Sequence, residues 1–166
     1  MSNTSLNKDA GNTARIKGVN MPISFKHSYE ISNFLTGMNL SKAKAYLDDV
    51  LVLKRAIPFT KFKGDVGHRP GKMGPGKYPF KASKTILQML KDVEANAQFK
   101  GLNTGSLVIK SMIANKGENA FHPGRKRRRK FKRTHLEIVV ESISVKSKVA
   151  EKAPKPEKNV KQEDKK

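Results

Sequence analysis

The stretch His135-Leu-Glu-Ile-Val-Val-Glu-Ser-Ile-Ser-Val145 decides the fold class of this chain. Its even positions from 136 to 140 are apolar and alternate with Glu, Val and Glu, which is typical of a β-strand with one buried face. A second predicted strand, Leu107–Asn115, precedes it, and the residues between the strands show no core-forming pattern. The two strands predict a long hairpin over residues 106–145. Because such a hairpin has no core of its own, it needs another surface to lie on.

The connection of this hairpin is densely basic. Arg125-Lys-Arg-Arg-Arg-Lys-Phe-Lys-Arg133 places eight cations in nine positions. Guanidinium groups bind phosphate through paired hydrogen bonds and stack on bases, and Phe131 could stack on an unpaired base. The alternatives are a nuclear localisation signal or a solvated run of charge. We favour nucleic-acid contact because further basic clusters lie elsewhere in the chain, and an import role is compatible with it.

Composition points to the same class of partner. The 166 residues include 35 Lys and Arg against 14 Asp and Glu, a formal net charge of +21, which predicts one domain plus tails. So large an excess repels itself unless an anionic partner neutralises it, and nucleic acid is the first candidate. An acidic membrane surface is the second, although no segment approaches the roughly 20 apolar residues of a membrane span. The absence of cysteine excludes disulfides and thiolate metal sites.

A short strand and two helices are predicted in the first third of the chain. Alternating apolar and polar residues indicate a strand over Met21–Lys26. Ser28 is a suitable helix N-cap, and Gly37 a suitable helix end. A second helix begins near Ser41 and has to stop before Pro58. The buried faces of the two helices are predicted at Ile31, Phe34, Leu35, Met38, Ala43, Tyr46, Leu47, Val50 and Leu51.

The clearest helix is predicted from Ser83 to about residue 100, with Gly101 as its C-cap. Together these elements predict an α+β fold, in which three helices pack on a small antiparallel sheet with a long protruding β-hairpin. We place this domain at residues 19–145. An N-terminal arm (1–18) precedes it, and a Lys/Glu/Pro tail (146–166) follows, which we expect to be disordered alone.

Residues 57–81 are predicted to form an irregular basic loop, rich in glycine and proline. Loops this long are uncommon in compact domains unless they are functional or bound by a partner. Four aromatic residues are interleaved with the cations of this loop. The sequence leaves open whether they anchor the loop on the domain or pack on RNA bases: Phe59, Phe62, Tyr78 and Phe80.

No constellation predicts catalysis, a metal or a cofactor. Gly71-Lys-Met-Gly-Pro-Gly-Lys77 nearly matches a phosphate-binding P-loop, but Tyr78 replaces the hydroxyl residue that would hold magnesium and Pro79 follows it. The four histidines lack zinc-site spacing. We expect the carboxylates Asp48, Asp49 and Glu94 to form ion pairs with nearby lysines. The chain is therefore not expected to be an enzyme.

Several stretches, in their order along the chain, resemble the large-subunit ribosomal protein twenty-two family, numbered seventeen in eukaryotes. The likeness covers about residues 19–143 and is of the archaeal and eukaryotic type. The stretches that carry it are Gly37-Met38, Ser41-Lys42-Ala43, Tyr46-Leu47-Asp48-Asp49-Val50, Ile57-Pro58-Phe59, Val66-Gly67, Met89-Leu90-Lys91-Asp92-Val93-Glu94-Ala95-Asn96-Ala97, Lys100-Gly101-Leu102, Ser106-Leu107-Val108-Ile109, Asn115-Lys116 and His135-Leu136-Glu137-Ile138.

The resemblance implies a structural role in the large ribosomal subunit, in translation and subunit assembly. Its partners would be large-subunit rRNA, neighbouring ribosomal proteins and the nascent polypeptide, because the family's hairpin reaches inward to line the exit tunnel. The implied location is the cytoplasm, with transit through the nucleus if the source is eukaryotic. In eukaryotic relatives the hairpin tip is usually longer, whereas here Arg133-Thr134 leads directly into His135.

We therefore predict a structural rRNA-binding protein without membrane association, and the alternative is a free-standing basic RNA- or DNA-binding protein of the chaperone or chromatin kind. Contacts of this type position RNA more than they read its sequence. The predicted RNA-binding residues are Lys26, Lys42, Lys44, Lys61, Lys63, His68, Arg69, Lys72, Lys77, Lys81, Lys116, Arg125, Lys126, Arg127, Arg128, Arg129, Lys130, Phe131, Lys132 and Arg133.

Overall fold

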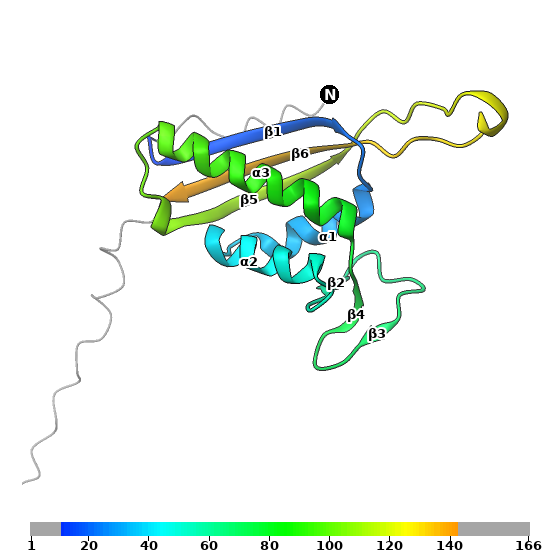
Figure 1. Cartoon of the computed structure of the whole chain (residues 1–166), viewed down its shortest axis with the longest axis horizontal. Helices are drawn as coiled ribbons and strands as arrows, with labels where there is room; N and C mark the ends of the chain where they lie inside the picture. Colours follow the sequence, from blue (N-terminus) through cyan, green and yellow to red (C-terminus); the bar gives the residue numbers. More distant parts are fainter. Residues whose placement is uncertain (1–10, 143–166) are drawn as a thin grey trace, which may run out of the picture.

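A computed structural model describes residues 11–142. Its main sheet has the strand order β1-β6-β5 and is antiparallel throughout, with β1 at Thr13–Met21, β5 at Leu107–Lys116 and β6 at Thr134–Ser142. Three helices pack against this sheet (Figure 1): α1 at Phe25–Leu35, α2 at Leu40–Leu51 and α3 at Phe80–Phe99. The predicted α+β class and the three helices are confirmed.

The alternation that predicted β6 is the pattern of its burial. Leu136, Ile138 and Val140 are fully buried, while the residues between them remain partly exposed. Their neighbours in the core come from β5 and all three helices, among them Ile109 and Leu90. Burying apolar surface of this kind stabilises a domain by about 25 cal/mol per Å². This one-sided core leaves the ends of the sheet free to carry other structures.

The strand predicted at Met21–Lys26 is wrong. Residues 13–21 form β1 instead, and its pairing with β6 places the predicted boundary at residue 18 inside a strand. The chain turns at Asn20, whose φ is +53°, and α1 already begins at Phe25. Few apolar residues mark β1, because its buried positions are filled by Ala14 and half-buried Ile16.

Two helices begin one turn before their predicted starts. Ser24, not Ser28, is the N-cap residue of α1, and the Ser28 hydroxyl donates to the Ser24 carbonyl at 3.0 Å. The α3 helix begins at Phe80, after Pro79, and Ser83 lies buried in its first turns. First-turn residues need no apolar periodicity, so this pattern does not mark a helix start. The predicted helix ends are confirmed by positive φ angles at Gly37 (+85°) and Gly101 (+72°).

The basic loop contains a second small sheet. Its strand order is β2-β4-β3, with β2 at Ile57–Pro58, β3 at His68–Arg69 and β4 at Gly74–Lys77. We call residues 57–79 the basic lobe. It projects from the helical layer next to the start of α3 (Figure 1). Its strands are too short for any periodicity to appear in the sequence.

The disorder predicted for the tail at 146–166, and for the arm up to residue 10, lies outside the described residues. Between residues 11 and 142, no helix is long and apolar enough to cross a bilayer.

Candidate RNA-binding surface

The hairpin between β5 and β6 extends beyond the main sheet as a folded structure. We call residues 117–133 the hairpin tip. The Gly117 amide donates to the Arg133 carbonyl at 2.9 Å, where the strands separate. Further out, the Phe131 amide donates to Ala120 and the His122 amide to Arg129, and a short 3₁₀-helix spans Gly124–Lys126. The tip is seen projecting from one end of the sheet in Figure 1.

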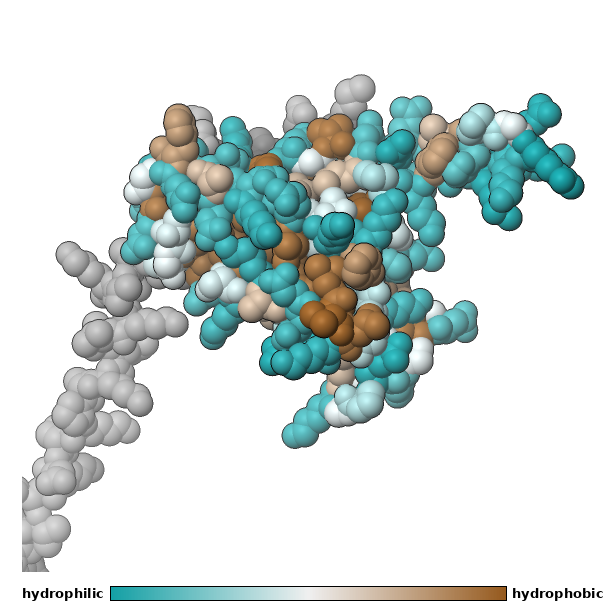
Figure 2. Space-filling model, in the orientation of Figure 1, coloured by the Kyte–Doolittle hydropathy of each residue, from teal (hydrophilic) through white to brown (hydrophobic). Residues whose placement is uncertain are grey.

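The arginine-rich run occupies the far end of the hairpin tip. Arg125 to Lys130 are all exposed, and the side chains of residues 125–129 line a hollow of about 770 Å³. In the space-filling view of Figure 2 the end of this projection is almost entirely hydrophilic. Within residues 11–142, no carboxylate forms an ion pair with any cation of the run. These cations therefore retain their full charge for an external anion.

Phe131 lies where the sequence placed it, but one face of its ring is already covered. The His122 ring stacks on it with centroids 3.5 Å apart and planes 28° from parallel. Phe121 is 58% exposed, and the Lys130 ammonium lies 4.7 Å from its ring centroid. The sequence analysis missed Phe121 and His122. The detectable signal was their position opposite Lys130 and Phe131 across a hairpin turn, since Phe121 and Lys130 form a β-bridge.

In the basic lobe, the predicted residues fall into two groups. Lys63, His68 and Lys72 are exposed. Others lie over aromatic rings: Lys61 is 4.8 Å from the Tyr29 centroid, and Arg69 is 5.0 Å from that of Tyr78. Arg69 also donates from Nε to the Gly76 carbonyl at 3.1 Å. A cation held over a ring keeps its charge but loses freedom, so the lobe presents a partly fixed array of charge.

The question of the four lobe aromatics is answered residue by residue. Phe59 is 3% exposed and belongs to the core, and Phe62 packs against that core beside Phe25 and Tyr29. These two anchor the lobe to α1. Tyr78 is half-buried beneath Arg69, whereas Phe80 is 55% exposed at the start of α3. Only Phe80 has a largely open ring.

A buried carboxylate fixes the near edge of the basic lobe. Glu30 of α1 is 1% exposed, and it accepts the amides of Thr60, Lys61 and Phe62 together with the Thr60 hydroxyl. Burial acts to raise the pKa of the Glu30 carboxyl, but these hydrogen bonds outweigh burial and hold its pKa below the ordinary value. The charge on Glu30 thus orders the backbone that carries Lys61.

Lys44 does not fit the predicted RNA-binding set. Its ammonium lies 2.5 Å from the Glu94 carboxylate, and the two side chains are 21% and 30% exposed. This pair joins α2 to α3, so Lys44 is engaged inside the protein, whereas Lys42 is exposed. The ion pairs expected of Asp49 and Glu94 are confirmed, the partners of Asp49 being Lys54 and Arg55. No ion pair of Asp48 occurs among the described residues.

Most of the remaining predicted residues gather at one end of the molecule. The hairpin tip and the basic lobe project from the same end of the sheet (Figure 1). Lys26 and Lys81 lie between them, at the starts of α1 and α3, and exposed Lys116 lies at the base of the tip. Lys42, at the start of α2, is the exception. The near-match to a P-loop has a different structure, because Gly74–Lys77 is the β4 strand, paired on both sides.

An α+β domain whose unpaired cations and open aromatic rings project from one end is a structural nucleic-acid-binding protein. Within that class the chain belongs to the family described as Ribosomal protein L22p/L17e, whose model matches residues 16–141. The match spans β1 through β6 and so includes both the basic lobe and the hairpin tip.

Curated relatives named large ribosomal subunit protein uL22 agree with this assignment. One from Thermoplasma volcanium is 49% identical over 106 residues, which cover 64% of this chain and 71% of that protein. One from Methanoculleus marisnigri is 41% identical over 140 residues, covering 80% and 92%. One from Methanococcus aeolicus is 38% identical over 150 residues, covering 85% and 97%. The resemblance inferred from short stretches is confirmed.

Proposed function

We propose that this chain is a structural constituent of the large ribosomal subunit that binds and organises its rRNA. The observation that carries the proposal is the hairpin tip, where a run of exposed cations has no carboxylate partner within residues 11–142. Held on a projecting hairpin, such charges can enter a space between RNA segments that repel one another. Each phosphate they neutralise releases counterions and favours binding.

The basic lobe supplies a second contact from the same end of the molecule. With the tip it forms a two-armed surface, and the two arms can bridge RNA segments that are distant in the RNA sequence. This arrangement favours organisation of rRNA over reading of its bases, since cations at phosphates position a protein without specifying sequence. Neighbouring ribosomal proteins are the other partners in this proposal, and the location is the ribosome in the cytoplasm.

The finer part of the proposal concerns the exit tunnel. We infer that the hairpin tip contributes to the tunnel wall and that its outermost residues lie near the nascent polypeptide. The support is the direction of the projection, away from the domain that buries the core, and the family to which the chain belongs. Nuclear transit would apply only in a eukaryotic cell, and the three relatives described above are archaeal.

Co-sedimentation tests the main proposal. A tagged copy of the chain should enter large subunits and remain with them in a high-salt sucrose gradient, because many simultaneous phosphate contacts keep it in place. The free-standing alternative predicts that the protein leaves the subunits while it still binds free RNA. A density map of the subunits that retain the protein would then test the tunnel position directly.

A further inference from the structure

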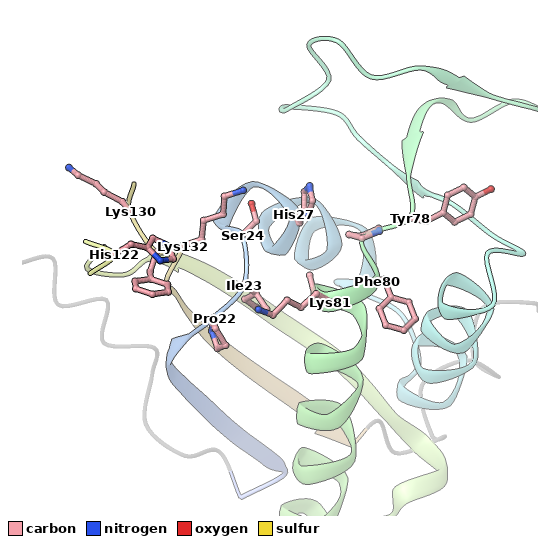
Figure 3. A pocket seen from close by; sticks show the side chains of 13 residues that line it. Pro22, Ile23, Ser24, His27, Tyr78, Phe80, Lys81, His122, Lys130 and Lys132 are labelled. Carbon is pink, nitrogen blue, oxygen red and sulfur yellow. The ribbon is translucent and has the colours of Figure 1, made fainter. Parts of the chain in front are cut away.

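A cleft of about 490 Å³ lies between the hairpin tip and the starts of α1 and α3. Three segments far apart in the sequence form its walls (Figure 3): the β1–α1 connection with His27, the first turn of α3, and the tip. Its volume falls in the range of roughly 300–1,000 Å³ that is typical of small-ligand sites. The sequence analysis predicted cations near here, but not an enclosed site.

The lining of this cleft suits an anion. Lys81, Lys130 and Lys132 line it together with two histidines, and no carboxylate does so among the described residues. In Figure 3, Lys81 extends from α3 toward the tip and Lys132 extends from the tip toward α1, while Lys130 points away. Burial, Lys77 and Lys132 together lower the pKa of the His27 imidazole, which shows that a further positive charge is unfavourable in the cleft.

Two helix ends add to the cationic side chains. Both α1 and α3 begin at the cleft, neither has an acidic residue in its first turn, and in the described part of the chain no side chain caps their first amides. First-turn amides have no acceptor within a helix. They bear partial positive charge and readily bind phosphate. Here they reinforce lysines that already face the same space.

The third wall is aromatic. His122 and Phe131 lie side by side in Figure 3, where the tip closes the cleft. Each covers one face of the other at 3.5 Å, and both rings remain partly exposed. A stacked pair of this kind is a platform for one more flat ring, since nucleic-acid bases stack on aromatic side chains without regard to sequence. The rings of Tyr78 and Phe80 point away from the cleft, so the tip alone supplies the platform.

We propose that this cleft holds one unpaired nucleotide of the rRNA, with its phosphate at Lys81, Lys132 and the two helix ends and its base stacked on the His122–Phe131 pair. The inference rests on the proposed rRNA-binding function and locates one contact within it. A nucleotide held there would join the tip to the body of the domain. The hairpin would then take a defined direction when RNA is bound.

The phosphate part is tested with the full-length chain and a single-stranded oligoribonucleotide titrated at several salt concentrations. The variant Lys81→Gln/Lys132→Gln should reduce the log–log salt slope of binding by about two, one for each lost phosphate contact. The matched control, Lys84→Gln/Lys91→Gln, removes two exposed lysines of α3 that do not line the cleft. It should leave the slope unchanged. Equal slopes for the two variants would overturn the phosphate site.

The base part is tested with His122→Ala, which should weaken oligoribonucleotide binding by about 5- to 150-fold, the range of one lost stacking contact. His122→Phe keeps a ring and should restore most of the affinity, whereas Phe99→Ala, at a ring that is 94% exposed and outside the cleft, should have no effect. Inorganic phosphate should bind His122→Ala and the parent chain equally. Loss of phosphate binding, or failure of the phenylalanine rescue, would refute stacking.

Amide chemical shifts locate the contact. Adding the oligoribonucleotide should shift the amides of Lys26, His27, Lys81 and Ala82, and no shift at these positions would exclude the cleft. The outcome is separable from that of the proposed function through Arg127→Gln/Arg128→Gln/Arg129→Gln. If this triple variant loses rRNA affinity while the cleft variants do not, only the cleft inference fails. If every variant binds like the parent chain, the proposed function fails as well.

Discussion

The Glu30 carboxylate accepts the Phe62 amide at 2.7 Å, across 32 positions of sequence. The same carboxylate accepts the amides of Thr60 at 3.0 Å and Lys61 at 2.9 Å. A buried negative charge on α1 therefore organises the first turn of a lobe whose other charges are mostly positive. In a chain of net charge +21, this anion is needed inside the protein and cannot serve as a solubilising surface group.

Replacing Glu30 with glutamine should destabilise the domain. The new NH₂ group is a donor that faces backbone amides, so at least one buried N–H loses its acceptor, at a cost of about 1–3 kcal/mol. Urea unfolding followed by circular dichroism measures the free energy of unfolding. The matched control is Glu118→Gln, an exposed site that should change stability by less than about 0.5 kcal/mol. Similar losses in both variants would contradict the assigned role of Glu30.

The same carboxyl predicts a dependence of stability on pH. Because the pKa of Glu30 is lower in the folded than in the unfolded chain, its stabilising contribution is complete above the unfolded pKa, about 4.3. It is lost as pH falls from there through the folded pKa. The difference in unfolding free energy between the parent chain and Glu30→Gln should therefore be constant from pH 7 to about 5 and shrink below about pH 4. A constant difference down to pH 3 would exclude this carboxyl as its source.

The base of the hairpin tip depends on a missing side chain. A Cβ added to Gly117 would lie 3.0 Å from the Arg133 Cβ and 3.1 Å from its backbone carbon, where the strands part. Gly117→Ala should push the strands apart and cost about 1–3 kcal/mol. The control Gly64→Ala, at a site with open space and no positive φ, should be neutral or slightly stabilising. Thermal unfolding of the two variants provides the measurement, and equal midpoints would disprove the close contact.

The sequence predicted those parts of the fold in which a pattern repeats. Apolar alternation located β6, and helical spacing located the buried faces of all three helices. The strand β1 escaped because Ala14 and Ile16 give a weak pattern, and its identity as a strand depends on pairing with a segment more than 100 residues later. The basic lobe escaped for a related reason, since strands of two residues have no period.

The candidate site was predictable in its charge but not in its pairing. Counting cations identified the hairpin tip, because charge density is a property of composition. Whether a given lysine is free depends on contacts distant in sequence, as Lys44 shows by meeting Glu94 across 50 positions. The stack of His122 on Phe131 likewise needs the hairpin to close before the two rings can meet.

The Lys44–Glu94 pair yields a prediction that separates stability from RNA binding. Lys44→Gln should leave rRNA affinity unchanged and lower the unfolding free energy, with a coupling to Glu94→Gln of about 1 kcal/mol or less, because both side chains retain some solvent exposure. Lys42→Gln, two positions earlier and exposed, should do the reverse. The measurements are a double-mutant cycle by urea unfolding and a filter-binding titration. Reduced rRNA affinity in Lys44→Gln would return this lysine to the RNA-binding set.

The hairpin tip predicts a change in salt dependence rather than in fold. Arg127, Arg128 and Arg129 are exposed and make no ion pair within residues 11–142, so replacing all three with glutamine should leave the unfolding free energy within about 0.5 kcal/mol of the parent value. The log–log slope of rRNA affinity against salt should fall by about one for each phosphate contact that is lost. Binding titrations at four salt concentrations measure that slope.

A matched triple variant makes the result for the tip specific. Lys84→Gln/Lys91→Gln/Lys110→Gln removes the same charge from exposed positions on α3 and β5. If net charge alone attracts RNA, both triple variants lose the same slope. If the projecting hairpin places its arginines against phosphates, only the tip variant does so, because a diffuse charge on the body of the domain reaches no phosphate closely enough to displace its counterions. Identical slopes would mean that the tip arginines face solvent.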